Sequence, residues 1–341
     1  MEYTNASNLP KAIERAVAND PYSSKGSNIS ATRLIAPPRI RVLEMRNWDL
    51  LKEDVSDKIF ALLGQSVHHI IQRSKQRVDL SERRLFYKDD KITNGWTLSG
   101  SFDYLERDGR LIDFKVTSAW ATLNALENPK PEWENQLNVL DFLCRKNQKT
   151  LTSYSKPIKV RSLSIMAILR DWSKLRVMQS DNYPRKQVVM IPVRRWTPEE
   201  QDDYIKARIK LHQDAEKSSK LPLCTAKERW RKEDSYALML DKRKTAKRVL
   251  PTREEMDQYL KANKMVEGQG CKVVFRKGED VRCMHYCRVN EFCDHYFNRT
   301  SSTLFPLLKA EYCFVNALLQ YSSYVYLRPK NSQYNWHIPL K

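Results

Sequence analysis

Two short stretches of this sequence bring two carboxylates and a lysine close together along the chain. Asp103 ends the stretch that begins at Gly100, and Asp113 and Lys115 lie two residues apart a little further on. Paired carboxylates can hold a divalent cation through hard oxygen ligands. A lysine beside such a cation can orient a water molecule and offset the negative charge that develops in phosphoryl transfer. These residue types therefore favour metal-dependent hydrolysis of phosphodiesters.

The two aspartates can act together only if the chain folds so that both lie on one face. Asp108-Gly109 indicates a tight turn, and apolar and polar residues alternate on the arm that follows, which predicts a β-hairpin. With a two-residue loop, Asp103 would lie opposite Phe114 and point away from Asp113. A three-residue loop that ends with glycine in the left-handed region instead places Asp103 opposite Asp113. We predict the three-residue loop.

Two amphipathic helices are expected on either side of the hairpin along the chain. The first spans residues 57–71 and carries His68, which can bind a metal through neutral imidazole. Gly64 lies one helical turn earlier, and a glycine there would let another element approach closely. The second helix spans residues 133–143, and its Gln136 could contact a phosphate or the attacking water. We expect His68 to point toward the two aspartates.

Taken in order, these motifs resemble the RecB-like branch of the PD-(D/E)XK nuclease superfamily. That branch carries G-x-x-x-H on a helix, then G-x-x-D, then D-x-K or E-x-K, and then Q-x-x-x-Y. The residues that match these motifs are, in order, Gly64 and His68, Gly100 and Asp103, Asp113 and Lys115, and Gln136 and Leu140. The last motif departs from the pattern, because Leu140 stands where the branch usually has tyrosine. The resemblance implies an α/β nuclease core, with a mixed central sheet flanked by helices, to which a cysteine-cluster region and further helices are added.

The resemblance also implies a role for each matched residue. The ligands of Mg²⁺ or Mn²⁺ would be His68, Asp103, Asp113 and the carbonyl oxygen of Phe114. The catalytic residues would be Asp103, Asp113, Lys115 and Gln136. Among these, Lys115 would position the attacking water.

Seven cysteines form a second group of chemically active residues. Cys283, Cys287 and Cys293 have the spacing C-x3-C-x5-C, which keeps three thiolates within reach of one metal centre. No secretory signal is recognised at the start of the sequence, and an odd number of cysteines argues against a disulfide framework. The residues themselves leave zinc and an iron–sulfur cluster as alternatives, because both accept four cysteines.

The resemblance favours the cluster, since several RecB-like nucleases carry three cysteines after the nuclease core. With a fourth cysteine, which usually precedes the nuclease motifs, these residues hold a [4Fe–4S] cluster. Here no cysteine precedes Cys144. The linear order resembles that of phage-encoded relatives, and it makes Cys224 the expected fourth ligand and Cys271 the runner-up. Structural Zn²⁺ is the alternative. Cys144 and Cys313 lie on helical patterns among apolar neighbours and are expected in the core.

The charge of the chain favours a polyanionic partner. There are 60 Lys and Arg residues against 41 Asp and Glu residues, a net charge of +19. The densest basic stretch spans residues 227–248, with nine basic and four acidic residues, and it includes Trp230 and Tyr236. Aromatic rings among cations can stack on unpaired bases. We therefore expect DNA as the partner, either single-stranded or at duplex ends. A membrane span is not expected, because the apolar runs are too short.

The sequence divides into four regions with different expected roles. These are an N-terminal arm or cap (1–55), the nuclease core (56–215), a basic cysteine-cluster region (216–300), and a C-terminal helix and tail (301–341). Within the core, strands are expected at 160–169 and 187–193, and a helix at 198–215.

The expected function is that of a Mg²⁺- or Mn²⁺-dependent deoxyribonuclease, and more narrowly an exonuclease acting on DNA ends or single strands. It would act in the cytoplasm of a bacterium or phage-infected host, in DNA recombination, replication or repair, alongside proteins of those processes. One alternative is a catalytically silent DNA-binding subunit stabilised by its metal cluster, and another is an RNA-directed nuclease. The intact set of Asp103, Asp113 and Lys115 favours an enzyme, because a protein that only binds DNA has no need of all three.

Overall fold

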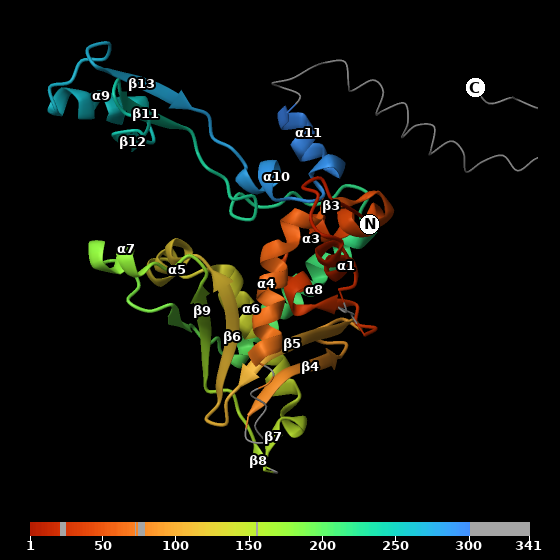
Figure 1. Ribbon diagram of the computed structural model, residues 1–341. Coiled ribbons are helices and arrows are strands. Elements are labelled where there is room, and N and C mark those ends of the chain that lie inside the picture. Colours follow the sequence, from red (N-terminus) through yellow and green to blue (C-terminus); the bar gives the residue numbers. More distant parts are fainter. Residues whose placement is uncertain (21–24, 72, 74–78, 155, 301–341) are drawn as a thin grey trace, which may run out of the picture. The chain divides into compact units, whose positions relative to one another are not determined.

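The structure, a computed structural model, describes residues 1–20, 25–71, 73, 79–154 and 156–300 (Figure 1). The chain separates into two units, Met1–Phe292 and Cys293–Lys341. The second unit is described only at its start, where α11 spans Asp294–Thr300. The helix expected near residues 304–319, like the whole C-terminal region 301–341, lies outside the described residues.

The first unit is built on a six-stranded mixed sheet. Its strand order is β10-β9-β6-β5-β2, and β4 pairs with β5 as well. The pairs β6–β9 and β2–β5 are parallel, whereas β4–β5, β5–β6 and β9–β10 are antiparallel. The strands are β2 (Ile29–Ser30), β4 (Leu80–Lys88), β5 (Thr97–Leu105), β6 (Arg110–Thr117), β9 (Ser162–Leu169) and β10 (Val188–Val193). The expected strands near 160–169 and 187–193 are confirmed as β9 and β10.

Helices lie around this sheet, some packed on it and others on neighbouring helices, so the expected mixed α/β architecture is confirmed. They are α2 (Ala31–Ile35), α3 (Pro38–Arg46), α4 (Ile59–Ile71), α5 (Ala119–Glu127), α6 (Pro131–Lys146), α7 (Lys174–Gln179) and α8 (Pro198–Lys217). α6 packs on β4, β5, β6, β9 and β10, while α8 packs on α6 and α4 packs on β6. None of the described helices combines the length and the apolar composition that a bilayer crossing requires.

The two long core helices follow directly from their sequences. Residues 137–144 of α6 are all buried, because the sheet and α8 cover this helix from different sides. α8 begins after Thr197, whose side chain accepts a hydrogen bond from the backbone N–H of Glu200 while the Glu200 carboxylate accepts one from the backbone N–H of Thr197. The expected helices at 133–143 and 198–215 are therefore confirmed, each extended by about one turn or less.

The first 55 residues contribute to the core as well as to the surface. β2 adds a short strand to the sheet, and Ile29 and Leu34 belong to the main hydrophobic cluster. The remaining elements of this segment lie outside that cluster. They are β1 (Glu2–Thr4), which pairs with β3 (Lys52–Asp54), α1 (Lys11–Ala18), and the short 3-10 helices η1 (Trp48–Leu50) and η2 (Val55–Lys58).

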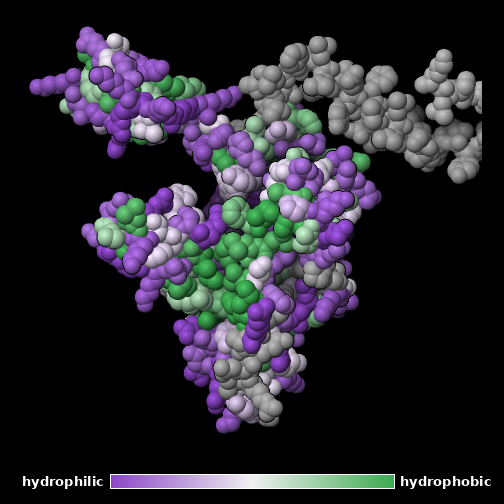
Figure 2. Space-filling model, in the orientation of Figure 1, coloured by the Kyte–Doolittle hydropathy of each residue, from purple (hydrophilic) through white to green (hydrophobic). Residues whose placement is uncertain are grey.

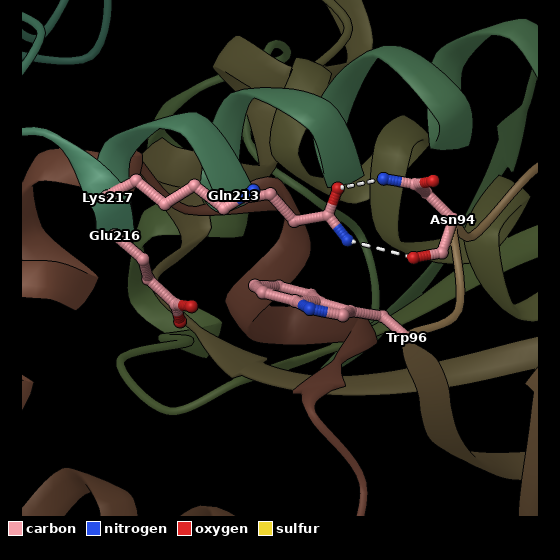
Figure 3. Close-up of a pocket in the computed structure, with 5 residues that line it drawn as sticks. All are labelled: Asn94, Trp96, Gln213, Glu216 and Lys217. Carbon is pink, nitrogen blue, oxygen red and sulfur yellow. Dashed lines mark hydrogen bonds between the residues drawn. The ribbon is translucent and has the colours of Figure 1, made fainter.

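The turn before β5 is fastened to α8 through side chains shown in Figure 3. Asn94, whose φ is +44°, donates from its side-chain amide to Gln213 and accepts a hydrogen bond on its backbone oxygen from the Gln213 amide (Figure 3). Together with Trp96, Glu216 and Lys217, these residues line a hollow of about 250 Å³. The two hydrogen bonds fix the start of β5, the strand that carries Asp103.

A second, smaller sheet follows α8 along the chain, and we call residues 235–276 the basic module. Its strand order is β12-β11-β13, all antiparallel. The elements are β11 (Ser235–Leu240), β12 (Arg248–Leu250), α9 (Arg253–Ala262) and β13 (Cys271–Arg276). A separate cluster of four buried residues, Leu238, Met256, Leu260 and Cys271, holds α9 on the sheet. α10 (Val281–His285) and η5 (Asn290–Phe292) follow the module.

Candidate active site

The β5–β6 hairpin has the three-residue loop that the sequence predicts. The backbone N–H of Glu106 donates to the carbonyl of Arg110 at 3.0 Å, and Gly109 donates to the carbonyl of Glu106 at 2.9 Å. Gly109 has a φ of +95°, and a Cβ there would collide with the carbonyl oxygen of Lys159. Only glycine satisfies both constraints, so this residue fixes the register of the hairpin.

That register places the two aspartates directly across from each other. Tyr104 pairs with Ile112 in the last rung of the ladder, so the next rung would join Asp103 and Asp113. At this point the strands separate, and the backbone N–H of Phe114 donates to the Asp103 carboxylate at 2.7 Å instead of to a backbone carbonyl. The side chain of Asp103 thus replaces a ladder hydrogen bond, which explains why the acidic residues lie where the strands part.

Asp113 lies at the centre of a network with Lys115 and Gln136. The Asp113 side chain is almost fully buried, with 1% of the residue exposed. Lys115 Nζ lies 2.8 Å from its Oδ2, and Gln136 Nε2 donates to its Oδ1 at 3.0 Å. Lys115 also donates to Gln136 Oε1 at 3.1 Å. No other described donor is aligned with Oδ2 of Asp113, so the lysine ammonium is its counter-charge.

A third carboxylate, not anticipated from the sequence, joins the site from β4. Glu82 lies opposite Asp103 in the β4–β5 register, between the pairs Ser81–Tyr104 and Arg83–Phe102. Its φ is +48°, a conformation that non-glycine residues seldom adopt and that is often retained at functional sites. No sequence pattern around Glu82 indicates the site, because its place there depends on the pairing of β4 with β5.

His68 points from α4 into this acidic cluster, as expected. Its Nδ1 lies 3.2 Å from Glu82 Oε1 and 3.6 Å from Asp103 Oδ2. Ligand atoms of His68, Glu82 and Asp103 all lie within 4.8 Å of one another, a spacing that suits a single cation. The ring of His68 also meets that of Phe114 edge to face at 6.2 Å between centroids, which holds α4 on β6.

The crowding of negative charge alters the protonation of the site. Burial, followed by the neighbouring charge of Asp113, raises the pKa of Asp103 to about 7. The hydrogen bond with Glu82, supported by the charges of the aspartates, raises the pKa of His68. A cation placed among these groups would replace the protons that they otherwise retain, because it offsets the same repulsion.

Two glycines of the sequence pattern have different surroundings. A Cβ on Gly100 would lie 2.7 Å from Leu140 and 2.8 Å from Leu143, so glycine is what lets α6 press against β5. The expectation for Gly64 is wrong, because no described atom lies within 4 Å of the place where its Cβ would be. Leu140, which takes the place of the usual tyrosine, is buried against Gly100. Its aliphatic side chain has no atom that can donate or accept a hydrogen bond in the acidic cluster.

The surface of α4 beside the site is apolar. Phe60, Leu63 and Ile70 are exposed, and Figure 2 shows hydrophobic side chains gathered over this helix. The guanidinium of Arg170 lies 4.3 Å from the centroid of the Phe60 ring. The helix that carries His68 thus also presents an apolar surface, and the guanidinium of Arg170 lies against it.

The cysteines fall into different surroundings. Cys144 is buried in α6 and Cys271 in the core of the basic module, where its thiol donates to the carbonyl of Val266. Cys224 lies in the loop after α8, and its carbonyl accepts a hydrogen bond from Arg229. The expected core position of Cys144 is confirmed, and Cys313 lies outside the described residues. The cluster ligands are assigned from the sequence, so the four-cysteine site stays a prediction.

Comparisons with known proteins give structural similarity alone. No family model and no curated protein matches the sequence. The solved structure of SSO0001 is similar at 14% identity and a TM-score of 0.38, over 61% of this chain and 84% of that one. An alkaline exonuclease, LHK-Exo from Laribacter hongkongensis, is similar at 14% identity and a TM-score of 0.30, over 54% of this chain and 87% of that one. The structure of LHK-Exo in complex with dAMP is similar at 14% identity and a TM-score of 0.33, over 55% of this chain and 88% of that one.

Proposed function

We propose that this protein is a metal-dependent nuclease whose active site lies where β5 and β6 separate. The observation that carries the proposal is the meeting of Asp103, Asp113 and Lys115 at one point. Two acids on facing strands with a lysine beside them are the groups that hydrolysis of a phosphodiester requires. Their order in the sequence also resembles that of PD-(D/E)XK nucleases.

The donor set fits Mg²⁺ or Mn²⁺. Oxygen atoms dominate it, as these hard cations prefer, and His68 adds one imidazole nitrogen. His68, Asp103 and Asp113 would be ligands, together with the carbonyl of Phe114 that the family resemblance implies, and Glu82 lies close enough to His68 and Asp103 to be a further ligand. When bound, such a cation polarises the phosphate and lowers the pKa of a water molecule.

The residues around Asp113 would organise the nucleophile. Lys115 carries a fixed positive charge next to the acidic pair, where it can hold a water molecule and offset charge on the phosphate. Gln136 hydrogen-bonds both Asp113 and Lys115. It therefore serves as a positioning residue that keeps the Lys115 ammonium in place. Direct contact between Gln136 and a phosphate stays a prediction from the sequence.

The polymer that we propose as substrate is DNA, cut as an exonuclease cuts it, from ends or along single strands. The net charge of +19 supports a nucleic acid as the partner. Exposed cations on the turn between β11 and β12 and at the start of β12 could supply phosphate contacts: Lys242, Arg243, Lys244, Lys247 and Arg248. Action in phage or bacterial recombination, replication or repair belongs to the same proposal. A silent DNA-binding subunit and an RNA-directed nuclease are the alternatives.

Cleavage of end-labelled DNA tests this function. Linear and circular substrates are incubated with the full chain, with and without Mn²⁺, and matched RNA is included. The proposal predicts metal-dependent loss of linear DNA with slower or no loss of circles. Equal cutting of circles would replace the exonuclease with an endonuclease, and preference for RNA would favour the RNA-directed alternative. No cutting of any substrate with Mn²⁺ would favour the silent subunit.

We also propose that Cys224, Cys283, Cys287 and Cys293 bind a [4Fe–4S] cluster. Protein purified without oxygen should then be brown and contain iron and sulfide. Cys283→Ser should bleach the colour, and Cys144→Ser should keep it because that residue belongs to the core. One zinc ion per colourless chain would favour the structural Zn²⁺ site. Bleaching by Cys271→Ser but not by Cys224→Ser would show that the wrong fourth ligand was chosen.

A further inference from the structure

Two exposed aromatic rings lie together outside the acidic site, on the segments that flank the basic module. Trp230 precedes β11, and Tyr286 follows α10. Their ring centroids are 5.3 Å apart at an interplanar angle of 58°. Trp230 is 43% exposed and Tyr286 is 68% exposed. Paired rings usually bury their apolar surface, so an exposed pair offers a surface on which a flat ligand can pack.

The backbone at Trp230 is held in an unfavourable conformation. Its φ is +55°, in the left-handed region that bulky residues seldom occupy. The turn is fixed by hydrogen bonds from the backbone N–H of Trp230 to Lys227 and of Arg231 to Ala226. Strain that is maintained by surrounding contacts is commonly found where a side chain must be presented in one direction. Here the effect is to hold the indole ring at the surface beside Tyr286.

A buried acid joins the two segments that carry the rings. Asp280 is 2% exposed, and its carboxylate lies 3.2 Å from Arg229 and 4.0 Å from Arg231. Arg231 and Asp280 also form a β-bridge, which two backbone hydrogen bonds between Lys232 and Glu279 extend. The turn before β11 and the start of α10 are therefore one connected framework, and the ring pair is formed in advance of any ligand.

Positive charge lies directly against the rings. The guanidinium of Arg282 is 5.5 Å from the centroid of the Trp230 ring and donates to the carbonyl of Glu228. Lys227 and Lys232, on either side of Trp230 in the sequence, are exposed. A ligand that suits this surface has a flat π-system and a negative charge nearby. An unpaired nucleotide has both features, whereas a duplex keeps its base faces covered.

We propose that Trp230, Tyr286 and Arg282 form a binding site for an unpaired nucleotide of a single-stranded nucleic acid. A base stacks on the exposed rings, and Arg282 with the neighbouring lysines faces the phosphate backbone. The choice of a nucleic acid as occupant rests on the proposed function. The site itself is separate from the acidic residues and would bind a strand without cutting it.

Binding of a fluorescent oligo(dT) measured by anisotropy tests the site apart from catalysis. The full chain carrying Lys115→Ala is used without divalent metal, so that cleavage does not intervene. Trp230→Ala and Tyr286→Ala should each weaken binding by roughly 5- to 100-fold, the range for loss of base stacking. Trp230→Phe should retain most of the affinity. Tyr154→Ala is the matched control and should leave binding unchanged. Tyr154 is also exposed and has a φ of +47°, and its ring centroid lies 5.8 Å from the guanidinium carbon of Arg107.

An abasic oligonucleotide of the same length shows whether bases are what the rings contact. The parent should bind it more weakly than oligo(dT), and Trp230→Ala should bind the two almost equally. Unchanged binding by Tyr286→Ala, whose side chain is mostly exposed and whose loss leaves the core intact, would overturn the proposal. Absence of oligo(dT) binding by the parent at low salt would also overturn it and favour a protein partner. Neither result affects the nuclease assignment, which the cleavage assay tests by itself.

Discussion

At the acidic site, buried and partly buried ionisable side chains meet across three strands, whereas in the basic module the cations lie on an exposed turn. Asp113 is 1% exposed and contacts Lys115 and Gln136. Lys242, Arg243 and Lys244 are exposed to solvent. A buried charge needs fixed partners because desolvation is costly, whereas an exposed charge needs none.

This difference predicts unequal responses to substitution. At the acidic site each group depends on the others, so one change should abolish chemistry and alter the protonation of its neighbours. In the module each cation acts almost independently through long-range attraction, so losses should be small and additive. The experiments that follow test this contrast, beginning with the largest expected effect.

Removing a group from the acidic site should have the largest effect. Asp113→Ala and Lys115→Ala should each lower turnover by at least ~100-fold, because charge stabilisation in the transition state is lost. DNA binding by Lys115→Ala in a chelator should change little. The measurement is single-turnover cleavage of end-labelled DNA, with Lys242→Gln from the module as the control that keeps its turnover. Parent-like cleavage by both site variants would refute the assignment of the site.

Removing the charge of Asp103, which is buried and lies next to Asp113, should stabilise the metal-free protein at high pH. The pKa of Asp103 is about 7 in the folded chain against an ordinary value of 3.8. Between these two pH values the folded state retains a proton that the unfolded state has lost, so the stability that Asp103 contributes is fully present below about pH 4 and declines as the pH rises through 7. Asp103→Asn should abolish this decline and gain roughly 2–4 kcal/mol at pH 8.

Denaturant unfolding in a chelator at pH 4.5 and pH 8 measures this effect. An exposed acid of the module provides the control, since Asp241→Asn should leave the free energy of unfolding unchanged at both pH values. An advantage of Asp103→Asn over the parent that is no larger at pH 8 than at pH 4.5 would show that burial and the charge of Asp113 do not raise the pKa of Asp103 in the fold.

Neutralising the basic turn should have a smaller and graded effect. The combined change of Lys242, Arg243 and Lys244 to glutamine should weaken DNA binding by about 10-fold at low salt, with little effect on turnover at saturating DNA. The slope of log K against log salt should become shallower by roughly 0.7–0.9 for each phosphate that the protein no longer neutralises. The double change of Lys156 and Lys159 to glutamine is the control and should leave the slope unchanged. Both lysines are exposed, and they lie on and just after the short strand β8 (Lys156–Pro157), outside the module. An unchanged slope would remove the module from the DNA-binding surface.

The sequence predicted the hairpin well because its information is local. Gly109 supplies the left-handed residue that ends a three-residue loop, and that loop length places Asp103 opposite Asp113. The capping box at Thr197 and the buried pattern of α6 are equally local signals. These features require no knowledge of distant parts of the chain.

The remaining features depend on tertiary contacts that no short pattern encodes. Glu82 enters the site because β4 pairs with β5 in one particular register, and its unusual φ cannot be read from the residue type. The failed expectation for Gly64 has the same origin. A helical glycine permits close packing, but whether another element arrives there is decided elsewhere in the fold. The pairing of Trp230 with Tyr286 likewise joins segments more than fifty residues apart in the sequence.

Calorimetric titration with Mn²⁺ tests the central claim, that the acidic residues form a metal site, most directly. The parent chain at pH 8 should bind Mn²⁺ at the site, and Asp103→Asn and Asp113→Asn should each lose most of that binding while Lys115→Ala retains it. Affinity for the parent should fall as the pH drops below about 7, because the proton on Asp103 must leave before the ion enters. Undiminished binding by a chain that carries both asparagine substitutions would contradict the account.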